Sequence, residues 1–499
     1  MIELLASAPL VGGVEPIPVE GQTDADLVLR SLLDPDHDTI VLASQPLAPV
    51  TSPRLWLPGL TRQQLDDLLG GSITDWAKVG VPTATPVQPV AIGGVAVSRA
   101  APATIQVPDY AGFLALLPQH PGALALAPLD VVDFQAGSPP VDDVRLLAET
   151  TPTGRAPLAL ALVATGSGPV WEQLKPWLAA QSGALAGGRP APTPLTVTFS
   201  GDVILGRTVH TIISRLGDFA APFRKVADEL KGADLTILDL ECTLSDTITP
   251  PTDPYTFSFM TRAAAADGLV LAGVDAVSQA NNHSMNFGAD GMRDTLAALD
   301  ARKILHFGIG EQLSQARQPV ILQAKGVKLA LLGFDGITGD TYGATGDSAG
   351  TSPLVADNLV ADIQAVRPKA DLVIPFIHWG VEYTLTPTDG QVLIAHQAID
   401  AGADMVVGSH PHWVQGVETY HGRPIVYSLG NFVFDQEWSL ETKQGLIMHL
   451  IFRGRRLAGL RFVPIMIEDY YQPRLAEGDE ISTILDRVWR SSDILAGTA

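Results

Sequence analysis

The sequence predicts an α/β fold in more than one domain, and three observations support this prediction. From Thr196 onward, apolar strand-like runs alternate with segments of helical spacing, a pattern typical of a sheet with helices on its faces. A chain of 499 residues is too long for a single hydrophobic core. Residues 184–194 are rich in Gly and Pro without periodicity, which predicts a linker.

The linker gives the predicted domains: a smaller α/β domain at residues 1–190, a larger one at 195–470 and a C-terminal tail at 471–499. In the first domain, Thr61 is placed to cap a helix that ends at a Gly pair. The apolar positions of this helix are Leu65, Leu68 and Leu69.

Two segments of the first domain, LTRQQLDDLLGGSITDWAKVG (60–80) and GALALAPLDVVD (122–133), resemble the phosphate-binding-protein-like (type 2 periplasmic binding) domains. The resemblance implies a ligand-binding module, although the serine- and threonine-rich anion loops of that family have no counterpart here. A small α/β packing module is the alternative interpretation.

The second domain is predicted to alternate strands and helices. Its strand-like runs are residues 195–206, 233–241, 275–283, 327–336, 371–380, 404–412 and 424–434. Helical spacing is found at 289–302 and 388–402, and a short amphipathic helix is expected at 481–495. His396 lies in the middle of the second helix and is predicted to be structural.

Polar residues stand where the predicted strands end. They are Asp202, Glu241, Asn282, His378, His410 and His412. Because ligands of open α/β sheets collect at the carboxyl ends of the strands, we expect these side chains to lie close together. Imidazole and carboxylate ligands suit Mn, Fe or Zn, so the set predicts two divalent metal ions. Singly, the histidines read equally well as structural residues, Asp202 as a helix cap and Asn282 as a turn residue.

Two further residues are candidates for catalysis. His283 follows a candidate ligand and suits a general acid that protonates a leaving oxygen. Arg207, one turn after Asp202, is placed to hold a phosphate oxygen, although a surface charge is the simpler interpretation. Two metal ions clamp a phosphoryl group and generate hydroxide from water, so no Ser or Cys nucleophile is required.

Five motifs, FSGDVILGR, LDLECTLS, ANNHSMNFGADG, FIHWGVEY and GADMVVGSHPHWVQGVETYHGRPIVYSLGNFVFD, resemble the CapA family of capsule (poly-γ-glutamate) synthesis proteins, over about residues 195 to 440. That family is similar to calcineurin-like metallophosphoesterases. The resemblance implies a four-layer α/β/β/α sandwich, the six strand-end residues above as metal ligands and His283 as the acid. This chain departs from the pattern at Ile204, where metallophosphoesterases carry a histidine ligand, and at Asp239, where Asn is usual.

The net charge of the chain limits the classes of binding partner that are expected. A net charge of −22 argues against a nucleic-acid partner, since phosphate backbones require clustered Lys and Arg. A small-molecule or polymer substrate, phosphorylated or poly-γ-glutamate, is expected instead. Neither a transmembrane segment nor, in residues 1–13, a secretory signal is visible. By family resemblance, the protein is expected to be extracytoplasmic or at the bacterial cell surface.

Two function classes follow. The first is a dinuclear metal-dependent hydrolase of phosphoesters, or of a related acyl or amide bond, in surface-polymer metabolism. The second is a non-catalytic protein in which the first domain captures a ligand and the second keeps a remnant metal site for polymer attachment.

Overall fold

The computed structural model describes residues 27–33, 40–93, 105–148, 159–166, 168–180, 192–253 and 255–498. The chain divides into two compact units, Met1–Thr193 and Pro194–Ala499. Most of the predicted linker, residues 184–191, lies outside the described residues, and so does the N-terminal stretch 1–13. No helix in the described part of the chain is long and apolar enough to span a membrane.

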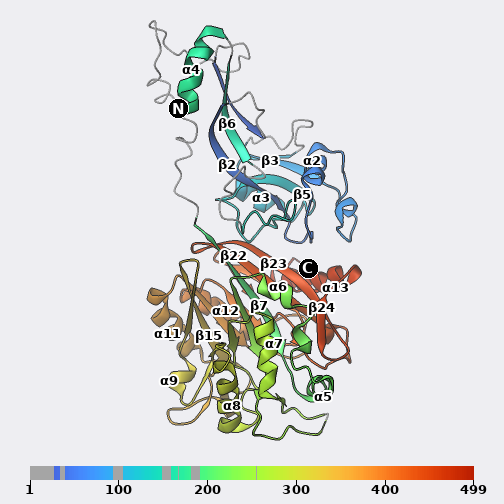
Figure 1. The fold of residues 1–499 in the computed structure, drawn as a ribbon, viewed down its shortest axis with the longest axis vertical. Helices are drawn as coiled ribbons and strands as arrows, with labels where there is room; N and C mark the ends of the chain where they lie inside the picture. Colours follow the sequence, from blue (N-terminus) through green and yellow to red (C-terminus); the bar gives the residue numbers. More distant parts are fainter. Residues whose placement is uncertain are drawn as a thin grey trace. The chain divides into compact units, whose positions relative to one another are not determined.

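The first unit contains one mixed sheet with the strand order β1-β6-β2-β5-β3-β4 (Figure 1). Its strands are β1 (Leu27–Leu33), β2 (Ile40–Thr51), β3 (Gln88–Ile92), β4 (Ile105–Val107), β5 (Ala123–Pro128) and β6 (Ala159–Gly166). Its α-helices are α2 (Arg62–Gly70), α3 (Tyr110–Leu116) and α4 (Gly168–Ala180).

Helix α2 begins and ends where the sequence predicts. The Thr61 side chain accepts a hydrogen bond from the Gln64 backbone N–H, and the Gln64 side-chain oxygen accepts one from the Thr61 backbone N–H, forming a capping box. At the other end, Gly71 adopts φ 79°, a conformation that favours glycine. The three predicted leucines of this helix are buried.

The second unit contains two large sheets. The first has the order β12-β11-β8-β7-β22-β23-β24, with β21 paired to β7, and comprises β7 (Pro194–Val203), β8 (Leu235–Leu240), β11 (Ala276–Ser278), β12 (Leu305–Phe307), β21 (Asn431–Val433), β22 (Gln444–Arg453), β23 (Arg456–Glu468) and β24 (Gln472–Leu475). The second has the order β14-β15-β17-β18-β20-β19, with β14 (Val320–Ala324), β15 (Val327–Asp335), β17 (Leu372–His378), β18 (Val406–Ser409), β19 (Val417–Tyr420) and β20 (Arg423–Val426).

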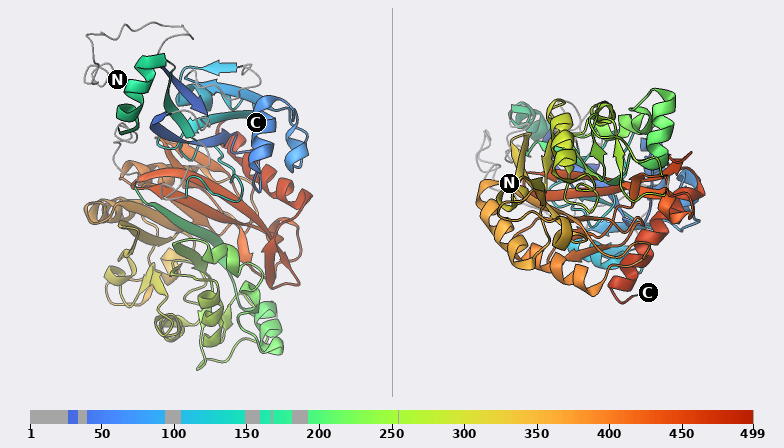
Figure 2. Two further views of the ribbon diagram at one scale, coloured as in Figure 1. Left: turned by 45° about the horizontal axis from the view of Figure 1, so that its top comes forward. Right: turned by 90° about the horizontal axis from the view of Figure 1, so that it is seen from below.

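Helices cover the outer faces of these two sheets, as Figure 2 shows from below. One core joins the first sheet to α5 (Arg207–Leu216), α7 (Ala266–Leu271) and α8 (Gly288–Asp300), and another joins the second sheet to α11 (Ala356–Val366) and α12 (Asp389–Asp400). Between the sheets, the rings of Phe199 in β7 and Phe376 in β17 meet edge to face, with centroids 5.9 Å apart. The unit is therefore a four-layer α/β/β/α sandwich, as the sequence predicts.

Two segments differ from their sequence-based interpretation. The run 424–434, read as one strand, is divided between the sheets: β20 belongs to the second and β21 to the first. The chain crosses between them at Gly430, which has φ 70° and whose carbonyl accepts a hydrogen bond from the Asp202 N–H at 3.1 Å. In the region expected as a tail, the structure adds strand β24, whereas the amphipathic helix expected at 481–495 is present as α13 (Asp479–Leu495) and contacts β19 and β23.

Candidate metal centre

The carboxyl ends of parallel strands from both sheets meet at the candidate site. Within the first sheet, Asp202 of β7 is in register with Asp239 of β8. Within the second, His378 of β17 is in register with Ser409 of β18. The strand-end residues were expected at one edge of a single sheet. In the structure they come from two sheets that face each other. All six predicted ligands belong to this region, and five of them are buried: Asp202, Glu241, His378, His410 and His412.

Glu241 is a buried carboxylate, and Nδ1 of His378 lies 3.7 Å from its Oε1. Neither of its oxygens has a hydrogen-bond partner among the described residues. Burial and the neighbouring charges of Asp202 and Asp239 raise the pKa of Glu241 well above its usual range. Because an unpaired buried carboxylate is costly, a cation at this position would stabilise the folded protein. The donor set here therefore fits a metal ion.

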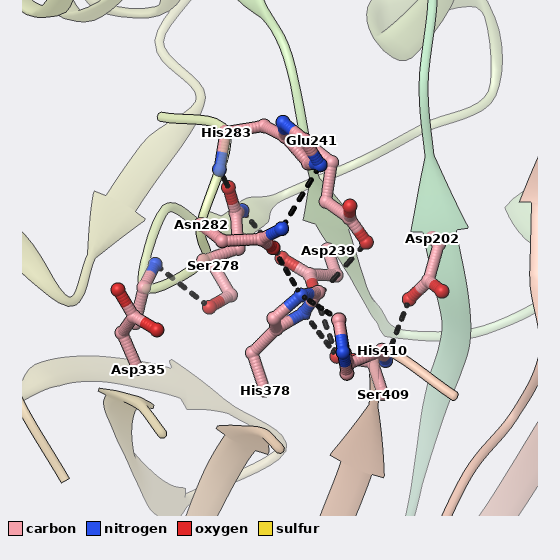
Figure 3. A network of polar contacts seen from close by, with 12 residues as sticks. Asp202, Asp239, Glu241, Ser278, Asn282, His283, Asp335, His378, Ser409 and His410 are labelled. Atoms are coloured by element: carbon pink, nitrogen blue, oxygen red, sulfur yellow. Dashed lines mark hydrogen bonds and ion pairs between the residues drawn. The ribbon is translucent and has the colours of Figure 1, made fainter. Parts of the chain in front are cut away.

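Three candidate ligand atoms converge next to Glu241. Nε2 of His378 lies 2.8 Å from Oδ1 of Asn282 and 3.1 Å from Nδ1 of His410 (Figure 3). Ligands that each lie about 2.0–2.2 Å from one metal ion are separated from each other by roughly 3 Å. The spacing of these three atoms therefore matches the coordination of a common ion.

Hydrogen-bond logic fixes the orientation of Asn282. The Phe259 backbone N–H donates to Oδ1 of Asn286 at 3.0 Å, so this oxygen also accepts from Nδ1–H of His283 at 3.1 Å. Nε2 of a neutral His283 then accepts from Nδ2 of Asn282 at 3.0 Å. The carbonyl oxygen of Asn282 is consequently the atom that faces His378.

The other ring nitrogen of His378, Nδ1, is held by the carboxylate of Asp239, which was not among the six predicted ligands. Nδ1 lies 2.8 Å from Oδ2 of Asp239 and 3.1 Å from Oγ of Ser409. Burial opposes the charged imidazole, but Asp239, followed by Asp202, outweighs it and raises the pKa of His378. A carboxylate on one ring nitrogen leaves the other directed at the metal position, a common arrangement in metal sites.

His412 is held in a similar way. Its Nδ1 lies 3.0 Å from Oδ2 of Asp202 and 2.9 Å from Oδ1 of Asn431. Its Nε2 lies 4.0 Å from Oε1 of Glu382, an exposed residue in the loop after β17. The charge of Glu382 therefore lies on the open side of the two histidines.

The Asp, Glu and His residues of the site form two groups. Within each group, the candidate ligand atoms lie within 4.8 Å of one another. One group, which we call the buried cluster, consists of Asp202, Asp239, Glu241 and His378. The other, which we call the rim cluster, consists of Glu382, His410 and His412. His410 joins them, because its Nδ1 faces His378.

Arg207 lies beside the site but is already paired. Its guanidinium contacts the carboxylate of Asp435 through Nε at 3.3 Å and through one terminal nitrogen. Its charged carbon lies 4.9 Å and 5.0 Å from the ring centroids of Phe259 and Phe434. To hold a phosphate, Arg207 has to share or exchange Asp435.

His283, the expected acid, is neutral in this environment. Burial is the main cause that lowers its pKa to about 3. Ile204, at the position where a histidine ligand is expected, is fully buried in the apolar core of the first sheet. An isoleucine side chain has no atom that binds a metal ion, so Ile204 supplies apolar packing at this position in place of a ligand.

Sequence reasoning missed Glu382, Ser409, Asn281 and Asn431 and mentioned Asp239 only as a departure. Of these, only Asp239 carried a signal, since it is a charged residue inside an otherwise apolar strand. The others resemble ordinary loop or strand-end polar residues.

Two sheets between helices, with Asp, Glu, Asn and His side chains at the facing strand ends, define an α/β/β/α sandwich with a candidate metal centre. The family model of the bacterial capsule synthesis protein PGA_cap matches residues 196–436. The chain belongs to this family, which confirms the resemblance seen in the sequence.

Two curated relatives agree. The capsule biosynthesis protein CapA of Bacillus anthracis is 34% identical over 282 residues, 55% of this chain and 68% of that protein. The PGA biosynthesis protein CapA of Bacillus subtilis is 31% identical over 256 residues, 51% of this chain and 67% of that protein.

Solved structures are more distant. The NAD nucleotidase of Haemophilus influenzae matches with 14% identity and a TM-score of 0.36, over 60% of this chain and 62% of that one. An ABC-type phosphate transport receptor from Vibrio cholerae matches with 18% identity and a TM-score of 0.25, over 33% of this chain and 78% of that one. At such low scores the resemblance of residues 60–133 to periplasmic binding domains stays a prediction.

Proposed function

We propose that the second unit is a metal-dependent hydrolase of phosphoesters, or of a related acyl or amide bond, in surface-polymer metabolism. One observation supports this proposal most directly. Nε2 of His378, Oδ1 of Asn282 and Nδ1 of His410 converge, and the nearby carboxylate of Glu241 has no hydrogen-bond partner among the described residues. Mixed oxygen and nitrogen ligands suit Mn, Fe or Zn, and the two clusters offer positions for two ions.

Each side chain has a defined task in this proposal. Two bound divalent ions would polarise the scissile group and supply hydroxide at neutral pH. Asp202 and Asn431 hold Nδ1 of His412 and thereby direct Nε2 of His412 toward the rim. Arg207 would bind an anionic oxygen of the substrate if one of its hydrogen bonds to Asp435 were broken.

The acid role of His283 depends on the substrate. A neutral His283 has no extra proton to give, because burial lowers its pKa to about 3. An anionic phosphoryl group next to the ring would raise this pKa and favour the imidazolium. His283 therefore donates a proton only in the presence of an anionic substrate.

The names of the relatives suggest the substrate class. They are a capsule biosynthesis protein and a PGA biosynthesis protein. We infer that this chain acts on poly-γ-glutamate or on a phosphorylated precursor of a surface polymer, outside the cytoplasmic membrane.

Replacement of His410 tests the proposal. We expect His410→Ala to lose metal content and most hydrolysis of a chromogenic phosphodiester, both measured on the purified chain. His396→Ala is the matched control, because His396 binds Glu418 at 2.7 Å and stacks on Tyr420, away from the candidate ligands. Unchanged metal content and an unchanged rate in His410→Ala would refute the hydrolase.

A second candidate is a non-catalytic binding protein that keeps a metal site for polymer attachment. The neutral state of His283 and the apolar Ile204 favour it. Tight metal binding without turnover on a broad panel of phosphoesters and amides would select this function.

A further inference from the structure

We propose that Asp239 is a positioning residue that holds metal ligands from both sheets in register; the inference rests on the proposed metal centre. Asp239 lies in β8 of the first sheet, and its side chain is fully buried. Figure 3 shows it between His378 and Ser409 from the second sheet and the turn that carries Asn282.

Both oxygens of Asp239 already accept hydrogen bonds. Oδ2 accepts from Oγ–H of Ser409 at 2.6 Å and from Nδ1–H of His378 at 2.8 Å. Oδ1 accepts from Nδ2–H of Asn281 at 3.0 Å. Glu241, two residues along the chain, has no such partner among the described residues. This contrast assigns metal coordination to Glu241 and positioning to Asp239.

On the second sheet, Asp239 acts on two histidines. Because Nδ1–H of His378 is bound to Asp239, Nε2 is the ring nitrogen directed toward Asn282 and His410, where its lone pair would be available to a bound ion. The bond from Ser409 fixes the residue that directly precedes His410. One carboxylate thus determines the ring orientation of His378 and the start of the loop that carries the rim histidines.

On the first sheet, Asp239 acts through Asn281. Oδ1 of Asn281 accepts from the backbone N–H of His283 at 3.2 Å, from the backbone N–H of Ser284 at 3.0 Å and from the Ser284 hydroxyl at 2.9 Å. These bonds close the turn that carries Asn282. Because Asp239 accepts a hydrogen bond from the amide of Asn281, it also helps to position the side chain of Asn282 against Nε2 of His378.

Mn²⁺ titration of the full chain tests the role. We expect Asp239→Ala to bind the same number of ions as wild type with about 10–100-fold lower affinity. The Mn²⁺ affinity of Asp239→Asn is expected to lie between those of wild type and Asp239→Ala. The variant keeps one oxygen that can accept hydrogen bonds, where the two carboxylate oxygens of wild type accept from three donors. It also preserves the volume of the side chain, and so serves if the alanine variant fails to fold.

Asp335→Asn is the matched control. Asp335 is a buried carboxylate in register with His378, but it accepts from the backbone N–H groups of Ile337 and Thr338 and from the hydroxyls of Thr338 and Thr351. The Asp335→Asn variant removes the same charge but no hydrogen bond to a ligand. Because the charge of Asp335 also contributes to the raised pKa of His378, the Mn²⁺ affinity of this variant should change far less than that of Asp239→Ala. An unchanged affinity in Asp239→Ala, or the loss of one ion at saturation, overturns the positioning role.

A second measurement separates this inference from the proposed function. If wild-type protein binds no Mn²⁺, the metal centre itself is refuted. Nitrogen-15 NMR of the histidines in the metal-free protein still reports on Asp239. At a pH where the ring is neutral, His378 should carry its proton on Nδ1 in wild type, and Asp239→Ala should populate the Nε2–H form. An unchanged tautomer in the variant refutes the role of Asp239.

Discussion

The buried cluster and the rim cluster use similar residue types in opposite surroundings. Within the buried cluster, three carboxylates and one imidazole are buried between the two sheets, and Glu241 has no hydrogen-bond partner among the described residues. The rim cluster has two buried imidazoles and one carboxylate, Glu382, whose side chain is 44% exposed. A negative charge on Glu241 in the buried cluster is therefore costly without a cation, whereas the charge of Glu382 in the rim cluster is well solvated. We infer that the buried cluster binds its ion tightly and that the rim cluster exchanges its ion readily.

The largest expected effect separates the two glutamates. Glu241→Gln should weaken metal binding by at least about 100-fold, because the variant removes a desolvated anionic ligand. Glu382→Gln should change it by less than about 3-fold, because water screens the exposed carboxylate. Calorimetric titration of both isosteric variants with Mn²⁺ measures the difference. Equal losses in the two variants would contradict the division into two clusters.

A smaller effect concerns the metal-free protein. The raised pKa of Glu241 means that folding must either keep this group protonated or bury its charge, so Glu241→Gln should stabilise the metal-free chain by about 1–3 kcal/mol near neutral pH. The gain should vanish below about pH 4.5, where the folded and unfolded chains are both protonated. Thermal unfolding in chelator is the measurement. Glu382→Gln, measured alongside, should leave the melting temperature unchanged.

The pH dependence of metal binding sharpens the comparison further. The pKa of His378 is raised despite burial, chiefly by Asp239, so below that pKa a proton on Nε2 competes with the metal. Affinity at the buried cluster should fall about tenfold for each pH unit below the pKa of His378. Burial holds the pKa of His410 well below its usual range, so the loss of affinity where His410 binds should begin at lower pH. A single pH profile common to both ions would contradict this prediction.

The smallest effect lies on the rim. Trp438 is 59% exposed and meets the ring of Tyr383 edge to face at 4.7 Å, while Tyr383 lies 5.9 Å from the His412 ring. An exposed, ordered tryptophan beside a site is suited to contact substrate. Trp438→Ala should raise KM by about 2- to 12-fold with metal affinity unchanged. Leu440→Ala, at a similarly exposed position of the same loop, is the control and should leave KM unchanged.

Much of the second unit was predictable from local pattern. The helices at 289–302 and 388–402 are found as α8 and α12, and His396 binds Glu418 as a structural residue. The strand-end polar residues were visible because each one interrupts an apolar run, and parallel strands carry such residues to the same end of a sheet. The run 424–434 was misread because its crossing between the sheets occurs at one glycine, Gly430, inside a mostly apolar stretch.

The sequence by itself determined the α/β class and which Asp, Glu, Asn and His residues are available to a metal ion, because these follow from the spacing of residues along the chain. The family followed from the resemblance of five motifs. Only the tertiary structure decided how those residues divide their tasks. Asp239 accepts from Ser409, 170 positions away, and Arg207 pairs with Asp435, 228 positions away. Hydrogen bonds and burial arise between distant segments, and no local pattern specifies which of two neighbouring carboxylates, Asp239 or Glu241, the fold leaves without a donor.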